Sequence, residues 1–151
     1  MKRKIYDQLL QWKNEKNGTT ALMIEGARRI GKSYIVEKFA ENEYESYILI
    51  DFSKAPVRVR GWFDEYLEDI DTLLQNIQLH YKKKLTPRKS LIIFDEVQKC
   101  PRAREAIKAL VEDHRFDYIP EREKRLVTNR LLDDVKGRMM EDIILLECAK
   151  V

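Results

Sequence analysis

IEGARRIGKS, from Ile24 to Ser33, is the stretch of the sequence that decides the fold. Within it, Gly26 to Ser33 match the pattern G-x-x-x-x-G-K-[ST] at every fixed position. An almost continuous apolar run, TALMIEG, leads into the first glycine, and KSYIVEKFAEN, with apolar residues at helical spacing, follows the second. A strand, a glycine loop and a helix in this order are the setting in which the pattern holds phosphate, so the stretch predicts a phosphate-binding loop.

Each residue type in this loop suits a phosphate. Gly26 and Gly31 let backbone N–H groups approach an anion closely, which a Cβ atom would obstruct. Lys32 can reach the β- and γ-phosphates, and the Ser33 hydroxyl can ligate Mg²⁺. The helix that begins near Lys32 adds the positive end of its dipole. The residues expected to contact the nucleotide are Gly26, Ala27, Arg28, Arg29, Ile30, Gly31, Lys32, Ser33 and Tyr34.

Buried strands alternate with amphipathic helices along the chain. The predicted strands are TALMIEG, YILIDFS, SLIIFDEVQK and FDYI, the last running from Phe116 to Ile119. The predicted helices are KIYDQLLQW, KSYIVEKFAEN, a segment from Phe63 to Tyr81 that is one helix or two joined near Asp69–Asp71, and a segment that starts at Pro101. This order predicts an α/β fold with a parallel sheet, whose ligands bind at the carboxyl ends of the strands.

Two carboxylates follow the strand LIIF and define the kind of phosphate site. A buried strand would hold Asp95 at the edge of the phosphate pocket, where it can orient a Mg²⁺-bound water. Glu96 could then polarise an attacking water as a general base. The alternative is that the two acidic residues cap the next helix. Together with the glycine loop, the pair predicts an ATP-hydrolysing site with Glu96 and Lys32 as catalytic residues and with Ser33 and Asp95 as Mg²⁺ ligands.

Size and composition narrow the other possibilities. The 151 residues suit one compact domain, and 44% hydrophobic with 36% charged residues suits a soluble globular protein. No apolar stretch approaches the roughly 18 residues of a membrane helix, and no signal peptide is evident, so we expect a cytoplasmic protein without a membrane partner. Cys100 and Cys148 are expected to be reduced thiols. The net charge of +3 does not imply nucleic-acid binding, and the basic loop YKKKLTPRK reads more simply as a solvated loop than as a polyanion contact.

The pair IEGARRIGKS and LIIFDEVQK, with YILIDFS between them, resembles the prokaryotic AAA-type P-loop ATPases that carry a nuclease-like C-terminal domain. The resemblance covers about Met1 to Ile119. It implies an ASCE-type parallel sheet in which the first motif is the Walker A loop and the second the Walker B strand. It also implies nucleotide roles for Gly26 to Ser33, Mg²⁺ roles for Ser33 and Asp95, and a catalytic Glu96 in a hydrolase that uses ATP and Mg²⁺.

The resemblance breaks after Ile119. Family members continue with a polar sensor residue, a last strand, a helical lid and an arginine finger, and none of these is evident here. We therefore expect a core at residues 1–119 and a helical tail at 120–151, as in a truncated or internally deleted member. Part of the tail, GRMMEDIILLE, resembles the first helix of the nuclease-like domain, with Glu141 at an active-site position. We do not infer nuclease activity from this resemblance.

A missing last strand would leave Ala21–Glu25 at an exposed sheet edge. DIILLE could fill the gap as a strand, the tail could cover it as helices, or a second molecule could pair with it. The helical interpretation is favoured, because Met139, Ile143 and Leu146 share a face. A homo-oligomer or partner protein could also supply an arginine. Neither the two arginines of the glycine loop nor those of the tail match the family's finger; these are Arg28, Arg29, Arg122, Arg125, Arg130 and Arg138.

Three functions stay open on the sequence. The first is a Mg²⁺-dependent ATPase with weak hydrolysis, and the second is a nucleotide-binding module or switch that binds ATP without turnover. The third, a small-molecule kinase, is disfavoured because the adjacent Asp95 and Glu96 suit water as the acceptor. ATP is the expected nucleotide, since no guanine-reading N-K-x-D motif is present.

Overall fold

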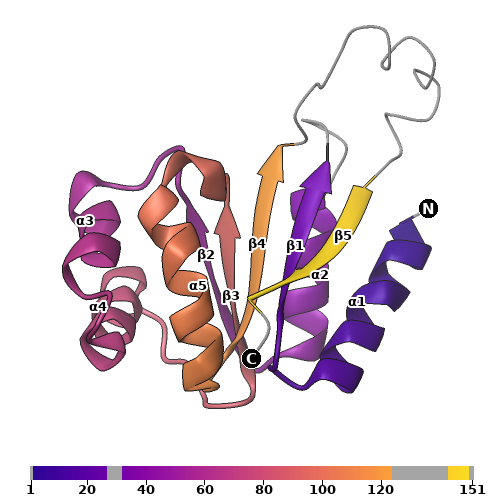
Figure 1. Ribbon diagram of the computed structural model, residues 1–151. Coiled ribbons are helices and arrows are strands. Elements are labelled where there is room, and N and C mark those ends of the chain that lie inside the picture. Colours follow the sequence, from indigo (N-terminus) through magenta and orange to yellow (C-terminus); the bar gives the residue numbers. More distant parts are fainter. Residues whose placement is uncertain (1, 27–31, 124–142, 150–151) are drawn as a thin grey trace, which may run out of the picture.

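The computed structural model describes residues 2–26, 32–123 and 143–149. Its elements, in chain order, are α1 (Lys2–Lys16), β1 (Ala21–Gly26), α2 (Lys32–Glu43), β2 (Ser46–Asp51), α3 (Val57–Glu65), α4 (Ile70–Tyr81), β3 (Ser90–Asp95), the short 3₁₀ helix η1 (Val97–Lys99), α5 (Pro101–Asp113), β4 (Asp117–Glu123) and β5 (Ile143–Cys148). Figure 1 shows a single twisted sheet with helices on both faces. The predicted α/β fold is therefore confirmed.

The sheet has five strands in the order β2-β3-β4-β1-β5. The first four run parallel to one another, with β4 between β3 and β1. Only β5 is antiparallel, and it pairs with β1. The carboxyl ends of β1, at Gly26, and of β3, at Asp95, thus flank the carboxyl end of β4, which lies between them (Figure 1).

Two apolar clusters hold the layers together, one on each face of the sheet. On one face, the helices α3, α4 and α5 pack against the sheet around a trio of rings, Phe52, Phe63 and Phe94. Their centroids lie 5.5–5.6 Å apart in edge-to-face geometry, which aromatic rings prefer. On the other face, α1 and α2 pack through residues such as Leu9 and Phe39, which are fully buried.

The segment from Phe63 to Tyr81 forms two helices, one of the two arrangements that the sequence left open. The break comes at Asp69, whose carboxylate accepts hydrogen bonds from the backbone N–H of Thr72 at 3.2 Å and from its hydroxyl at 2.6 Å. These bonds satisfy the first turn of α4 and lower the pKa of Asp69. The cap makes α4 begin at Ile70 rather than continue α3.

The fourth strand differs from its prediction at the carboxyl end. Instead of ending at Ile119, β4 runs through Pro120 to Glu123. The register pairs Asp117–Pro120 with β3, and Glu121–Glu123 with β1. Pro120 lies where one ladder gives way to the other, so its missing N–H donor is tolerated within the sheet.

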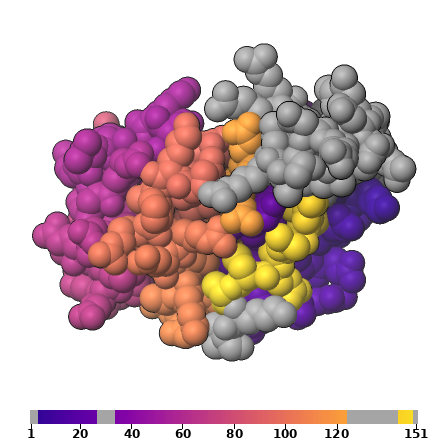
Figure 2. Space-filling view, turned by 45° about the horizontal axis from the view of Figure 1, so that its top comes forward, coloured from indigo at the N-terminus to yellow at the C-terminus, as the bar shows by residue number. Residues whose placement is uncertain are grey.

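The expectation of a helix at DIILLE is wrong, since Ile143–Cys148 form β5. This strand pairs with β1 along its whole length, from Ala21 opposite Cys148 to Gly26 opposite Ile143. The predicted exposed edge at Ala21–Glu25 is thus covered by the chain itself, and the predicted absence of a fifth strand is also wrong. The pairing satisfies backbone groups of β1 that would otherwise face solvent. Figure 2 shows β5 at the surface of the face that carries α5.

The remaining expectations about the tail fall mainly on residues 124–142, including Met139 and Glu141. These residues lie outside the described part of the chain.

Candidate functional site

The predicted phosphate loop is placed only at its two ends. Gly26 is the last residue of β1, and Lys32 is the first of α2, so the strand and the helix that the motif requires are both present. Ala27, Arg28, Arg29, Ile30 and Gly31 lie outside the described residues, as do the side chains of Lys32 and Ser33. Tyr34 follows on α2 with 57% of its surface exposed, and the Lys38 ammonium lies 6.0 Å from its ring centroid.

Asp95 ends β3 at the same edge of the sheet as Gly26 ends β1, because the strands between them are parallel. It is half-buried, and its backbone carbonyl accepts a 3.0 Å hydrogen bond from the N–H of Phe52. Across the ladder its partner is Asp51, the last residue of β2. The Asp51 carboxylate is bound into its own turn by the N–H and hydroxyl of Ser53, at 2.9 and 2.6 Å. Asp95 is therefore the strand-end carboxylate nearer to β4 and β1.

Glu96 adopts a left-handed backbone conformation, with φ 54° and ψ 45°. This conformation is uncommon for a residue other than glycine, and it often occurs at functional sites. The Gln98 side-chain amide donates a 2.6 Å hydrogen bond to Oε2 of Glu96. The Glu96 side chain does not cap η1, and α5 begins at Pro101 after Cys100. The capping role that the sequence left open is thus not the role of Glu96.

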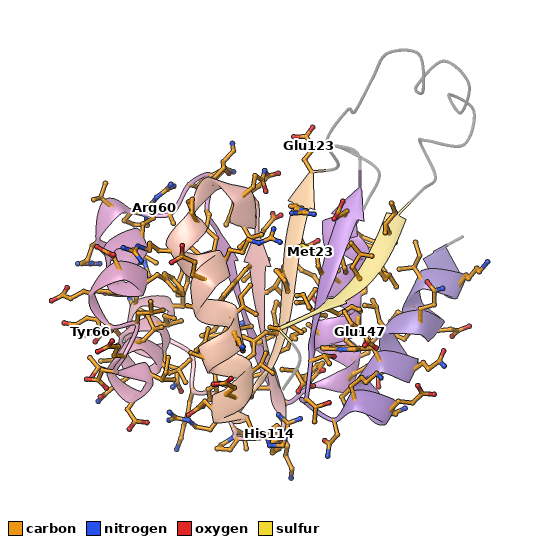
Figure 3. The ribbon with its side chains drawn as sticks, viewed as in Figure 1. Met23, Arg60, Tyr66, His114, Glu123 and Glu147 are labelled. Carbon is orange, nitrogen blue, oxygen red and sulfur yellow. The ribbon has the colours of Figure 1, made fainter. Side chains whose placement is uncertain are left out.

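A cavity of about 410 Å³ opens beside these residues, at the carboxyl ends of β1 and β4. Its lining consists of Glu25, Val97, Gln98, Pro101, Arg104, Arg122 and Glu123. Within it, the Arg122 guanidinium forms an ion pair with the Glu25 carboxylate. Figure 3 shows Glu123, the next residue, at the tip of β4, on the edge where β1 also ends.

Sequence reasoning missed these cavity residues as site residues. Arg122 was placed in a tail with no counterpart in the family, because the fourth strand was expected to end at Ile119. The available signal was the charged run PERE directly after the apolar FDYI, which is the position of polar residues at the end of a parallel strand. Glu25 was treated only as part of the strand before the loop.

The donor set at this edge suits a hard cation. Within residues 2–26, 32–123 and 143–149, no three His, Cys, Asp or Glu side chains are grouped to hold a metal by themselves. A Mg²⁺ ion binds carboxylate, hydroxyl and phosphate oxygens and keeps several waters, so it needs few protein ligands. The carboxylate of Asp95 and the hydroxyl group that a serine such as Ser33 carries are oxygen donors of the kind that Mg²⁺ requires.

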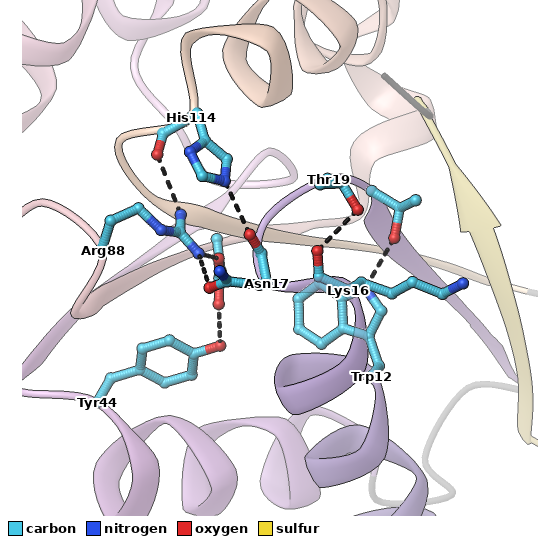
Figure 4. Close-up of polar contacts among 9 residues, drawn as sticks. Trp12, Lys16, Asn17, Thr19, Tyr44, Arg88 and His114 are labelled. Carbon is cyan, nitrogen blue, oxygen red and sulfur yellow. Dashed lines mark hydrogen bonds and ion pairs between the residues drawn. The ribbon is translucent and has the colours of Figure 1, made fainter.

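A larger cavity, of about 530 Å³, lies away from this edge, against α4 and the basic loop that follows it. Its lining includes exposed lysines at positions 82–84, and the Lys83 ammonium lies 4.5 Å from the Tyr47 ring centroid. Among the described residues, neither Gly26 at the end of β1 nor the acidic pair borders it, so its size does not make it the functional site. Arg88, counted with the basic loop, is instead bound to the body of the protein: it pairs with Asp117 at 2.8 Å and donates to the His114 carbonyl (Figure 4).

A family model described as an AAA domain matches residues 18–144. The matched region contains the glycine loop and the acidic pair, and it continues past Ile119 into β5. Searches of the curated proteins and of the solved structures found no match. In the described part of the chain, no helix is both long and apolar enough to cross a membrane.

Proposed function

The chain belongs to the AAA domain family, and from this premise we propose that it binds ATP with Mg²⁺ and hydrolyses the nucleotide slowly. The observation that carries the proposal is the arrangement of β1, β4 and β3. The strand that leads into G-x-x-x-x-G-K-S and the strand that ends in Asp95-Glu96 terminate at one edge, on either side of β4. A bound phosphate chain would lie between the glycine loop and the acidic pair.

The nucleotide contacts in this proposal come from Gly26 to Tyr34. The backbone N–H groups of the loop cradle the phosphates, and Lys32 adds a positive charge toward the β- and γ-phosphates. Ser33 and Asp95 would hold Mg²⁺, which neutralises charge on the phosphate oxygens when it is bound. Asp95 suits this role because its place at the end of β3 leaves its side chain half-exposed rather than buried in the core.

Glu96 would act as the general base. A carboxylate oxygen of Glu96 would take a proton from the attacking water, while the Gln98 amide holds Oε2 of the same carboxylate at 2.6 Å. That hydrogen bond fixes the orientation of the carboxylate.

Slow turnover follows from the charges available at the transferred phosphoryl group. An arginine finger contributes about 10³–10⁵ in rate in related enzymes. The arginines of the glycine loop and of the tail do not match the family's finger, so we propose that a second subunit or a partner protein supplies the missing charge. Alone, the chain would bind ATP well and hydrolyse it poorly.

A second candidate is a switch that binds ATP without turnover. The observation that favours it is the same Gln98–Glu96 hydrogen bond, because it occupies an oxygen of the proposed base. In this candidate the bound nucleotide changes the surface of the protein, and release rather than hydrolysis ends the bound state.

Binding and turnover measured on one preparation separate the candidates. With saturating MgATP, we expect calorimetric binding and phosphate release well below about 1 s⁻¹, the lower end of usual enzyme rates. Glu96→Gln provides the background, since the amide keeps the shape but cannot take a proton. Release equal to this background supports the switch. Absence of nucleotide binding would overturn both candidates.

A further inference from the structure

The Arg60 guanidinium joins two backbone segments that lie next to the acidic pair. Arg60 is half-buried on α3, and Figure 3 labels it there. Its Nη1 donates a 2.6 Å hydrogen bond to the carbonyl of Phe52, the residue that follows β2. Its Nη2 donates to the carbonyl of Lys99, the last residue of η1. One side chain thus connects α3 with the segments that follow β2 and β3.

Each of these two segments is hydrogen-bonded to one member of the acidic pair. The N–H of Phe52 donates to the Asp95 carbonyl at 3.0 Å, and the N–H of Lys99 donates to the Glu96 carbonyl at 3.0 Å. In both branches, the residue whose carbonyl accepts from Arg60 donates its own N–H to the backbone of the pair. A single guanidinium is therefore linked to Asp95 and to Glu96 through one intervening residue each.

Buried side chains of α3 determine where Arg60 lies. Val59 and Phe63, on either side of it in the helix, are fully buried. The Phe63 ring packs edge-to-face against Phe52, with 5.5 Å between the ring centroids. Because a close-packed interior leaves little room for displacement, this contact fixes α3 relative to the segment that follows β2. The Arg60 side chain thus extends from a defined point.

An arginine suits two acceptors that belong to different segments. The guanidinium is planar and permanently charged, and its terminal nitrogens donate in fixed directions. Its hydrogen bonds to carbonyl oxygens are stronger than those between neutral groups. Glu96 needs such support, because its left-handed backbone, with φ 54°, persists in a residue other than glycine only when the surroundings hold it. The bond from Arg60 to Lys99 closes the turn that Glu96 begins.

We propose that Arg60 is a positioning residue for the acidic pair, which holds Asp95 and Glu96 at the distance from the nucleotide that Mg²⁺ binding and proton transfer require. This inference rests on the proposed function. Arg60 acts through backbone carbonyls and contacts neither nucleotide nor metal in this arrangement. A displacement of about 1 Å in a reacting group can lower a rate by about 10². Loss of Arg60 should therefore affect Mg²⁺-dependent binding through Asp95 and turnover through Glu96.

The test compares the parent chain with Arg60→Ala, Arg60→Lys and the control Arg58→Ala. Arg58 lies on the same helix, but its side chain is exposed and its Nη2 lies 3.0 Å from His80 Nδ1, on α4. ATP affinity is measured by calorimetric titration with and without Mg²⁺. Phosphate release is measured at saturating MgATP, with Glu96→Gln as the background. The gain in affinity caused by Mg²⁺ reports on Asp95, and release above the background reports on Glu96.

The expected result is a loss confined to these two quantities. Arg60→Ala should reduce the gain in affinity from Mg²⁺ by about ten-fold, and phosphate release by about ten-fold or more. ATP affinity without Mg²⁺ should not change. Arg60→Lys should retain part of both quantities, because its single nitrogen keeps the charge but cannot reproduce the forked contact. Arg58→Ala should behave as the parent.

Amide hydrogen exchange on the nucleotide-free protein gives a readout that does not depend on activity. In Arg60→Ala, the amides of Phe52 and Lys99 should exchange about ten-fold faster, because the segments that they belong to lose a charge-assisted contact. The amides of Ile92 and Ile93, in the middle of β3, should keep their rates. Faster exchange at all four amides would instead indicate a general loss of stability.

Several outcomes overturn the inference. An unchanged gain from Mg²⁺ together with unchanged phosphate release in Arg60→Ala would show that Arg60 does not position the pair. Equal losses of ATP affinity with and without Mg²⁺ would assign Arg60 a structural role, as would an effect of the same size in Arg58→Ala. If Arg60→Ala does not fold, Arg60→Lys decides: parent values of both quantities then reject the inference.

The same measurements separate this inference from the proposed function. If the parent chain binds no ATP, the proposed function fails and the role of Arg60 fails with it. If Mg²⁺ increases ATP affinity in the parent and Asp95→Ala removes the increase, the nucleotide site stands. An unchanged increase in Arg60→Ala then rejects the inference alone. If release from the parent equals that of Glu96→Gln, the gain from Mg²⁺ and the hydrogen exchange still decide the role of Arg60.

Discussion

Strand β4 carries an arginine–carboxylate pair near each end, and the two pairs are built differently. At the amino end, Arg88 pairs with Asp117, whose side chain is 5% exposed. Both carboxylate oxygens of Asp117 are used: Oδ1 accepts from Arg88 at 2.8 Å, and Oδ2 accepts from the Tyr44 hydroxyl at 2.6 Å. At the carboxyl end, the pair of Arg122 and Glu25 faces a cavity.

The surroundings of the two arginines extend the contrast. Arg88 also donates to the His114 carbonyl at 3.1 Å and to Asn17 Oδ1 at 3.4 Å, and the His114 ring contacts the Asn17 carbonyl at 2.8 Å (Figure 4). This network ties together the turns before β1 and β4. Nearby, Gly18 has φ +80°, and a Cβ there would lie 2.5 Å from the Arg88 guanidinium, so the network is packed closely. The Arg88–Asp117 pair is thus enclosed by hydrogen-bonded neighbours at the amino end of β4, whereas the Arg122–Glu25 pair borders a cavity at the carboxyl end.

The largest expected effect tests this difference through stability. Asp117→Ala should lower the free energy of unfolding by about 3 kcal/mol, because it leaves Arg88 and the Tyr44 hydroxyl without their buried partner. Glu25→Ala should cost less than about 1 kcal/mol, since Arg122 can turn to solvent. Urea denaturation of both variants measures the two values. Equal losses of unfolding free energy would show that the Glu25–Arg122 pair stabilises the fold as much as the Arg88–Asp117 pair does.

Lys32→Ala should affect binding instead of stability. Loss of the charge directed at the β- and γ-phosphates should reduce ATP affinity by about ten-fold or more. The free energy of unfolding should change by less than about 0.5 kcal/mol, as for a substitution away from the core. Titration and denaturation of one preparation give both numbers. Unchanged ATP affinity would contradict the phosphate-loop assignment.

Substitutions of Asp95 and of Glu96 should have different effects on ATP binding and turnover. Asp95→Ala should weaken Mg²⁺-dependent ATP affinity, because a metal ligand is lost. Glu96→Gln should keep affinity and lose turnover, since only proton transfer is removed. Titrations with and without Mg²⁺, beside phosphate release, distinguish them. Matching losses of binding in both variants would point to a shared structural role for the pair.

Tyr44→Phe should give the smallest effect, about 1 kcal/mol of unfolding free energy, through the lost hydrogen bond to Asp117. Burial, with the nearby charge of Asp117, raises the pKa of the Tyr44 hydroxyl above its ordinary value of 10.0. The folded state therefore keeps the proton that the unfolded chain loses, so this stabilisation is complete below pH 10 and declines above it. Denaturation at alkaline pH should show a shallower decline for Tyr44→Phe. An identical slope would mean that Tyr44 does not titrate differently in the folded state.

Local pattern was enough to predict most of the sheet and its helices. The apolar runs at β1, β2 and β3 and the periodicity of α1, α2 and α5 each carry their own signal. The acidic pair at the end of β3 is also predictable from the sequence, because consecutive residues alone indicate where this strand ends.

The errors arose where pairing decides the structure. DIILLE has apolar residues that satisfy a helix or a strand, and it becomes β5 only because β1 offers an unpaired edge. The fourth strand was predicted to end at Ile119, but β4 continues through Pro120, which is tolerated where the β3 ladder passes to the β1 ladder. The Glu25–Arg122 pair depends on the register between two strands far apart in the sequence, which no local pattern specifies.

The position of β1 between β4 and β5 has a consequence for how the molecule folds. Both partners of β1 come from the later part of the chain, although β1 itself comes near its beginning. Such non-local pairing is slow, because the entropy of closing a long loop is lost before the contacts form. During synthesis, the strand that leads into the glycine loop would wait for β4 and then β5 to emerge from the ribosome. Amide hydrogen exchange in Ala21–Gly26 would then report on the last steps of folding rather than on the first.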